Sequence, residues 1–375
     1  TWGAIVEAKV GASLIEQAQM DAYLDLARDL DFDAVLSISN QLVTSSSDYP
    51  ITVDRRKLRR VGLQHWSWVN VLTEAILQKE HRGVSDPDQA FILNELIRYL
   101  SDPRSGAVAF DSMGGSWPRV RDGARNGTLR KTDPEVGTVA SRWDDLVRYL
   151  CLDLTKDLGR DVRQLLGKTE RTPATRKGAI QEALASSGRL YAELQVPDAV
   201  GTIRLVADLQ ARQVIVSTGF EAPREGRSPG RLSWLLRQLP DAPEGLKIEA
   251  KVSRSRQVLA ALLQDVREQP GLLHPESGKE ISRFVLTLTR NMGLKRDAGR
   301  GSFIESVLDT TREFYSSVLQ GLKAWKASPP KLKKAHDEEP SPDEGLPPPV
   351  HRAIERAEDE MDEATPSEHP TSKDA

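Results

Sequence analysis

The first forty residues combine two patterns of apolar and polar positions. Residues 4–10 (AIVEAKV) have the character of a β-strand, and residues 33–39 (DAVLSIS) form a second short apolar run between polar neighbours. Between them, residues 14–30 place apolar side chains at near-helical spacing. A strand, a helix and a second strand in this order predict the parallel crossover unit of an α/β fold.

The pattern continues as further elements up to residue 166. A strand is predicted at residues 61–66 and a helix at 68–78, with Ser67 as its N-cap. Two more helices are predicted at 88–100 and 136–166. The first half of the chain therefore reads as a sheet accompanied by helices.

One basic segment interrupts these elements. Residues 113–130 contain Gly114-Gly115 and Trp117-Pro118, which argue against a helix and predict a turn-rich loop. Basic side chains on such a loop are candidate contacts to a nucleic-acid backbone, with an ordinary solvated surface as the alternative. The candidate residues are Arg119, Arg121, Arg125 and Arg130.

The second half shows a different pattern. Residues 169–176 are rich in Lys, Arg, Thr and Pro, and we place a domain boundary there. Three strand-like runs joined by short turns then predict an antiparallel meander, and more helices and strands follow, so this module is α+β. Its predicted strands are 189–197, 202–209, 213–220, 246–252 and 281–288, and its predicted helices are 228–239 and 303–325.

Composition separates the end of the chain from the rest. Residues 327–375 hold thirteen acidic against six basic side chains, many prolines and few apolar residues, which predicts a disordered acidic tail. The remaining residues then have a net charge near +4, which suits a phosphate-backbone ligand but is also common on ordinary surfaces. We thus expect three parts, at residues 1–168, 177–326 and 327–375.

Several classes of protein are disfavoured by the residues present. Cys151 is the only cysteine, so neither an intrachain disulfide nor a cysteine-based zinc site can form within the chain. We expect Cys151 to be a small buried residue of a helix. The apolar runs are too short to cross a membrane and no leader is evident, so we expect a cytoplasmic protein. His65 lies beside tryptophans and is expected to be structural. No H-x-x-x-H pair, Gly-rich phosphate loop or G-x-S-x-G elbow occurs.

The most informative chemistry lies on the first predicted strand. Glu7 and Lys9 are two residues apart, so on a strand both side chains point to the same face. A carboxylate and the carbonyl of Ala8 are oxygen ligands that a hard divalent cation prefers, and a nearby lysine can orient a water and stabilise negative charge. This is the chemistry that phosphodiester hydrolysis requires.

With the helix that follows, these residues resemble the PD-(D/E)XK nuclease superfamily. The strand residues Ile5-Val6 and the triplet Glu7-Ala8-Lys9 precede Gln19 and Tyr23, a Q-x-x-x-Y pattern typical of the RecB-like branch. The resemblance covers roughly residues 2–100 and implies a restriction-endonuclease-like αβ core, incomplete at its N-terminus, ahead of the α+β module. It implies Glu7 and Ala8 as ligands of Mg²⁺ (or Mn²⁺), Lys9 as the catalytic lysine, and Gln19 and Tyr23 beside the active site.

Two features complicate this reading. The superfamily's first metal-binding Asp precedes the triplet, yet no acidic residue lies before Glu7, so we expect either a missing upstream segment or a degenerate, non-catalytic relative. A second triplet, Glu249-Ala250-Lys251, follows Pro240-Asp241 and matches the bare motif better, but it lacks the helix with Q-x-x-x-Y. The context therefore favours the first triplet.

The resemblance implies a metal-dependent hydrolase that cleaves DNA, with a non-catalytic module that binds nucleic acid or protein as the alternative. The module at 177–326 has no recognised relative and is expected to provide targeting or assembly. Four arginines around Trp234 are a candidate surface for nucleic acid or an acidic partner, or a solvated helix face. They are Arg224, Arg227, Arg231 and Arg237.

Overall fold

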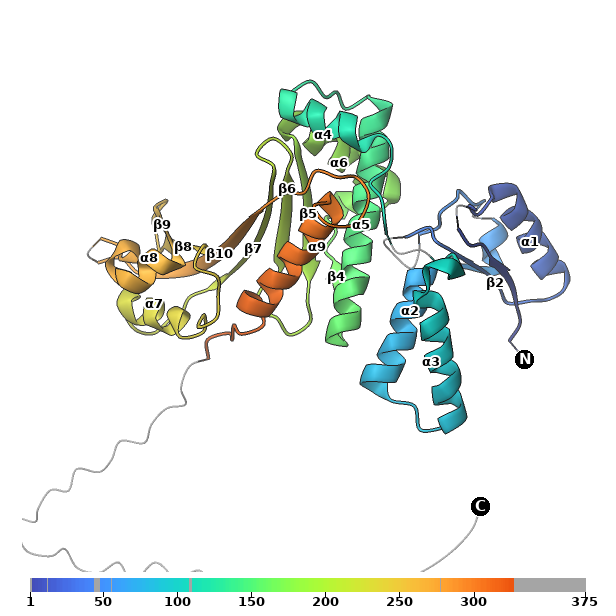
Figure 1. Cartoon of the computed structure of the whole chain (residues 1–375), viewed down its shortest axis with the longest axis horizontal. Helices are drawn as coiled ribbons and strands as arrows, with labels where there is room; N and C mark the ends of the chain where they lie inside the picture. Colours follow the sequence, from blue (N-terminus) through green and yellow to red (C-terminus); the bar gives the residue numbers. More distant parts are fainter. Residues whose placement is uncertain are drawn as a thin grey trace, which may run out of the picture. The chain divides into compact units, whose positions relative to one another are not determined.

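A computed structural model describes residues 2–326, except 12, 44–47, 55, 108–109 and 277 (Figure 1). The predicted tail at 327–375 lies outside the described residues. The described part contains a small parallel sheet with helices, followed by a seven-stranded antiparallel sheet with its own helices. The predicted combination of an α/β part and an α+β module is confirmed at this level.

The first sheet contains the predicted crossover unit. Its strands are parallel in the order β1-β2-β3, with Ala8 opposite Ile38 at the end of β1. Helix α1 covers the sheet because Met20, Leu24 and Ala27 on one of its faces are buried in a small apolar core. The elements are β1 (Ala4–Ala8), α1 (Gln17–Asp29), β2 (Ala34–Ser39), η1 (Lys57–Arg59) and β3 (Gly62–Ser67).

Two helices that follow β3 lie side by side (Figure 1). The Ser67 hydroxyl accepts a hydrogen bond from the backbone N–H of Asn70, so the predicted N-cap is confirmed. Asp86 caps the second helix through the N–H groups of Asp88 and Gln89. The elements are α2 (Trp68–Ile76), which continues as the π-helical segment Leu77–Arg82, then α3 (Pro87–Ser101) and the 3-10 turn Pro103–Ser105.

The second sheet is antiparallel throughout. Its order is β4-β5-β6-β7-β10-β8-β9, so the three strands predicted as a meander are neighbours. β4 and β9 were not predicted, and β4 has only two residues. The strands are β4 (Arg163–Gln164), β5 (Arg189–Gln195), β6 (Ile203–Asp208), β7 (Gln213–Glu221), β8 (Lys247–Val252), β9 (Val258–Leu262) and β10 (Ile281–Asn291).

Helices from both halves of the chain pack against this sheet. Trp117, Trp143 and Phe303 are fully buried and stack, with ring centroids of Trp117 and Phe303 4.3 Å apart. The hydrophobic cluster extends from Phe110 to Leu322 and includes side chains on both sides of residues 169–176, where the domain division stays a prediction. The helices are α4 (Trp117–Asn126), α5 (Pro134–Leu158), α6 (Pro173–Ser187), α7 (Ser228–Leu236), α8 (Leu263–Glu268) and α9 (Phe303–Phe314), with shorter turns at Lys168–Glu170, Pro270–Leu273 and Tyr315–Leu319.

The prediction of a loop at residues 113–130 was wrong, because this segment contains α4, with Pro118 in its first turn. The segment proposed as a domain boundary contains the start of α6, with Thr172 as N-cap and Pro173 as its first residue. Proline lacks an N–H group, but the first turn of a helix needs none, so proline there favours a helix start. In addition, α5 ends at Leu158, short of residue 166, because Gly159 adopts a left-handed conformation with φ of 65°.

Within the described residues, every helix is too short or too polar to cross a membrane.

Candidate functional site

The first triplet places its two charged groups together, as predicted. The ammonium of Lys9, which directly follows β1, lies 2.9 Å from the Oε1 atom of Glu7 on β1. The Glu7 side chain is 15% exposed and that of Lys9 27%, so the pair is partly shielded yet still reachable from solvent. The spacing of two on a strand is what brings both side chains to one face.

Helix α1 brings two further polar groups to the same carboxylate. Gln19 donates from Nε2 to Glu7 Oε1 at 3.1 Å, and the Tyr23 hydroxyl donates to Glu7 Oε2 at 3.1 Å. Gln19 also donates to the Tyr23 oxygen at 3.0 Å, as expected for residues four apart on one helix face. The sequence pattern Q-x-x-x-Y thus corresponds to a direct contact with the triplet; its catalytic role stays a prediction.

These contacts fix the charges of the pair. The pKa of Glu7 is lowered, chiefly by the hydrogen bond from Lys9 and also by those from Tyr23 and Gln19, against the opposing effect of burial. The pKa of Lys9 is raised, chiefly by its hydrogen bond to Glu7. At neutral pH, Glu7 is therefore a carboxylate and Lys9 an ammonium.

The backbone of Lys9 is held from two sides. Its N–H donates to the Ile38 carbonyl at 2.8 Å, and its carbonyl accepts from the indole N–H of Trp68 at 2.8 Å. Because backbone groups alternate in direction along a strand, the Ala8 carbonyl points away from β2. Sequence analysis missed Trp68, although its place directly after β3 puts it, like Lys9, at the carboxyl ends of the parallel strands.

The donor atoms suit a hard cation but are few. A carboxylate offers about four acceptor positions, and the Lys9, Gln19 and Tyr23 contacts use three of those on Glu7. One position and the Ala8 carbonyl remain, both oxygen donors of the type that Mg²⁺ binds. Among the described residues, no group of three or more His, Cys, Asp or Glu side chains could hold a metal ion. The described residues therefore supply some of the ligands of a metal site but not a complete set.

The second triplet has a different environment. On β8, the Glu249 carboxylate pairs with Lys247 at 2.6 Å, while Lys251 is exposed. β8 lies between β10 and β9, so both of its edges are occupied. Glu249 has no counterpart of the contacts that Gln19 and Tyr23 make with Glu7 in the described part of the chain.

The four arginines predicted to contact nucleic acid have different environments. On α4, Arg119 pairs with Glu135 at 2.5 Å, and Arg121 binds Asp122 at 2.8 Å and the Leu294 carbonyl at 2.8 Å. Arg125 and Arg130 are exposed. Nucleic-acid binding by these four residues stays a prediction.

In the second module, Arg231 is a structural residue. Its guanidinium donates to the backbone carbonyls of Gly226 at 3.1 Å, Arg224 at 2.9 Å and Ile281 at 2.5 Å. It therefore ties the start of α7 to β10. A surface role for the arginines around Trp234 stays a prediction.

The expectations for His65 and Cys151 agree with the structure. His65 is buried, its Nε2 donates to the Gln41 carbonyl at 2.9 Å, and its Nδ1 lies 2.8 Å from the Ser37 hydroxyl. Burial lowers its pKa, so the ring is neutral. Cys151 is buried in α5, and burial raises the pKa of its thiol to about 12.

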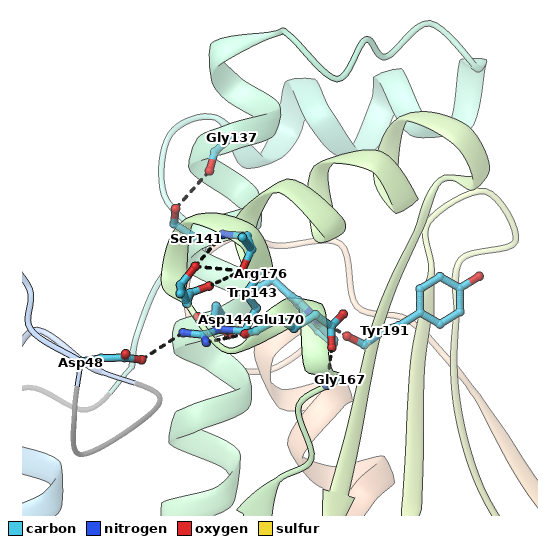
Figure 2. A network of polar contacts seen from close by, with 11 residues as sticks. Asp48, Gly137, Ser141, Trp143, Asp144, Gly167, Glu170, Arg176 and Tyr191 are labelled. Atoms are coloured by element: carbon cyan, nitrogen blue, oxygen red, sulfur yellow. Dashed lines mark hydrogen bonds and ion pairs between the residues drawn. The ribbon is translucent and has the colours of Figure 1, made fainter.

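A cavity of about 790 Å³ lies beyond the carboxyl ends of β1 and β2, bordered on the other side by α5 and α6. Figure 2 shows Arg176 at its wall, with its guanidinium directed to Asp144 and Asp48. Arg176 Nε lies 2.8 Å from both carboxylate oxygens of Asp144, and another guanidinium nitrogen donates to the Glu170 carbonyl at 3.1 Å. Sequence analysis missed this network because its members are far apart in the chain.

Asp145 lines the same cavity, and its raised pKa predicts a pH-dependent contribution to stability. Burial raises its pKa from 3.8 to about 6, against the attraction of Arg142. Between these two values the folded state holds more protons than the unfolded state, so stability falls as pH rises through this window and stays lower above it. We expect Asp145→Asn to remove this loss.

The measurement is the free energy of unfolding in urea at pH 5 and pH 8 for both proteins. The stability of Asp145→Asn relative to wild type should increase by on the order of 1 kcal/mol between these pH values, since one pKa unit corresponds to about 1.4 kcal/mol. A relative stability that does not change with pH would contradict the assignment to Asp145.

Comparisons of the chain with protein-family models, with curated proteins and with solved structures give no match.

Proposed function

We propose that the chain is a metal-dependent nuclease of the PD-(D/E)XK type that hydrolyses phosphodiester bonds in DNA. The observation that supports this most is the convergence of Lys9, Gln19 and Tyr23 on the Glu7 carboxylate, from a strand and the helix that follows it. A bare E-x-K triplet is too common to be informative, as the second triplet on β8 illustrates. Contact between the triplet and a Q-x-x-x-Y pair is a far more specific arrangement.

In this proposal each residue has one task. Glu7 and the Ala8 carbonyl would hold Mg²⁺, which when bound polarises the phosphoryl group and lowers the pKa of a water. The Lys9 ammonium orients the attacking water and stabilises the negative charge that develops on the phosphate. Gln19 and Tyr23 fix the orientation of the Glu7 carboxylate. Trp68 holds the backbone of Lys9 and is a positioning residue.

The proposal is tested by cleavage of labelled single- and double-stranded DNA with Mg²⁺, with Mn²⁺, and with a chelator. Cleavage that requires the metal supports a nuclease. A folded protein that binds DNA but never cleaves it would favour the non-catalytic binding module.

Tyr23→Phe is expected to lower the cleavage rate about tenfold. The substitution removes only the hydroxyl that donates to Glu7 Oε2, and a hydrogen bond to a charged group contributes about 1.5–3 kcal/mol. The readout is kcat from cleavage at saturating DNA, together with the Mg²⁺ concentration at half-maximal rate. Tyr99→Phe on α3, where the side chain is 62% exposed, is the matched control. An equal effect of both substitutions would show that Tyr23 does not act through Glu7.

A further inference from the structure

The segment that leads into β3 carries a strong positive charge. Residues 55–60 read Arg-Arg-Lys-Leu-Arg-Arg, with five basic side chains in six positions. In the structure, Arg56, Arg59 and Arg60 are exposed, while Arg55 lies outside the described residues. The segment forms the turn η1 (Lys57–Arg59) directly before β3.

The other two residues of the run anchor it to the protein. The Lys57 ammonium lies 2.7 Å from Asp25 Oδ2 and donates to the Asp21 carbonyl at 3.1 Å, both on α1. Leu58 packs against the small apolar core. The turn itself is closed by the Lys57 N–H, which donates to the Asp54 carbonyl at 3.0 Å. Lys57 and Leu58 therefore point inward and fix the backbone that carries the three arginines.

The exposed arginine side chains of this loop have no partner among the described residues. Within the described residues, none of the guanidinium groups of Arg56, Arg59 and Arg60 takes part in an ion pair or a side-chain hydrogen bond. In contrast, Lys57 and Arg28 pair with the nearby acids of α1 and offset their charge. Guanidinium groups bind phosphate oxygens in a bidentate manner, so three unpaired arginines within five residues match a run of phosphates.

The same helix connects this loop to the candidate catalytic cluster. α1 contacts Glu7 through Gln19 and Tyr23. It contacts the loop through Asp21 and Asp25. These two pairs flank the buried face of the helix, one pair on each side. The edge strands β1 and β3 are separated by two strand spacings, roughly 10 Å. Because the strands are parallel, the loop lies before the start of β3, whereas Glu7 and Lys9 lie at the end of β1, so a bound strand would also have to extend along the strand direction.

We infer that Arg56, Arg59 and Arg60 form a contact surface for the phosphate backbone of the nucleic acid whose cleavage is proposed above. This inference rests on the proposed function for its choice of ligand. Binding through this surface is nonspecific in sequence and falls with increasing salt, because each phosphate contact releases condensed counterions.

The test is the affinity of the full chain for a fluorescein-labelled 30-base-pair duplex, measured by anisotropy between about 50 and 300 mM KCl in EDTA, where cleavage does not interfere. The triple variant Arg56→Gln/Arg59→Gln/Arg60→Gln should reduce the slope of log affinity against log salt by about 2 to 3, since each lost contact accounts for about 0.9. A matched control removes three other exposed arginine charges that have no assigned binding role, in Arg98→Gln/Arg104→Gln/Arg163→Gln. Thermal unfolding checks that both variants fold.

The outcomes separate the two proposals. A reduced slope in the loop variant alone supports the surface, even if no protein cleaves DNA and the nuclease proposal fails. Equal slopes for wild type and the loop variant, or equal losses in both triple variants, would overturn the assignment to the loop. So would wild-type binding to phosphatidylserine vesicles as tight as binding to DNA, because the surface would then recognise anions in general.

Discussion

Lys9→Ala is expected to lower metal-dependent DNA cleavage by on the order of a thousandfold. The ammonium is held 2.9 Å from the Glu7 carboxylate and its pKa is raised by that contact, so at neutral pH it carries its full charge. Removing a preorganised group that stabilises charge in the transition state typically costs between a hundredfold and ten-thousandfold in rate. The measurement is kcat for the labelled duplex with saturating Mg²⁺.

The chain contains a matched control for this substitution. Lys251→Ala changes the lysine of the second triplet, which is exposed on β8 and has no contact resembling that of Lys9 with Glu7 among the described residues. Its cleavage rate should remain within about twofold of wild type, as expected for a surface substitution. If Lys251→Ala abolished cleavage and Lys9→Ala did not, the catalytic triplet would be the one on β8. If neither changed the rate, a site elsewhere would be responsible.

The candidate site was accessible to sequence analysis because its geometry is local. Glu7 and Lys9 share a face because a strand has a period of two, and Gln19 and Tyr23 share a face because residues four apart on a helix are neighbours. The crossover from β1 to α1 and β2 then leaves little freedom in how the helix meets the strand. These short-range rules place each pair on one face, and the resemblance implied that the two pairs would lie beside each other.

The contacts that connect distant parts of the chain could not be predicted in this way. Trp68 reaches Lys9 across 59 residues, and Arg176 reaches Asp48 across 128. No period in the sequence indicates such a pair. The basic run at 55–60 is visible in the sequence, but only the structure shows that Lys57 points inward while the arginines point outward.

The wrong loop prediction has a simple physical origin. Proline and glycine in 113–130 were taken as signs of a loop, and proline in 169–176 as part of a domain boundary, yet Pro118 and Pro173 lie in the first turns of α4 and α6. Proline in the interior of a helix breaks it, whereas proline in the first turn is compatible with a helix start. Which of the two applies depends on whether the following residues have an apolar face to bury. For α4 they do, through Trp117, Val120 and Ala124.

Arg176→Met is expected to lower the free energy of unfolding by about 3 kcal/mol or more. The Arg176 side chain is only 3% exposed, and its guanidinium lies between the Asp144 and Asp48 carboxylates, which are 16% and 9% exposed (Figure 2). Methionine preserves much of the apolar stem but removes the charge. The two largely buried carboxylates then lose the guanidinium that pairs with both of them. Removing one partner of a buried ion pair typically costs about 3–5 kcal/mol.

The destabilisation should come from the charges left behind rather than from lost packing. Arg176→Met/Asp144→Asn removes one of those charges as well, so it should be more stable than Arg176→Met alone, and urea unfolding of the two single variants and the double variant measures this coupling. Arg163→Met is the surface control, since its ion pair with Asp161 is 74% and 57% exposed and should contribute less than about 1 kcal/mol. An Arg176→Met protein as stable as Arg163→Met would mean that the network contributes nothing to holding Asp48 against α5 and α6. The cavity wall beyond β1 and β2 would then depend on apolar packing alone.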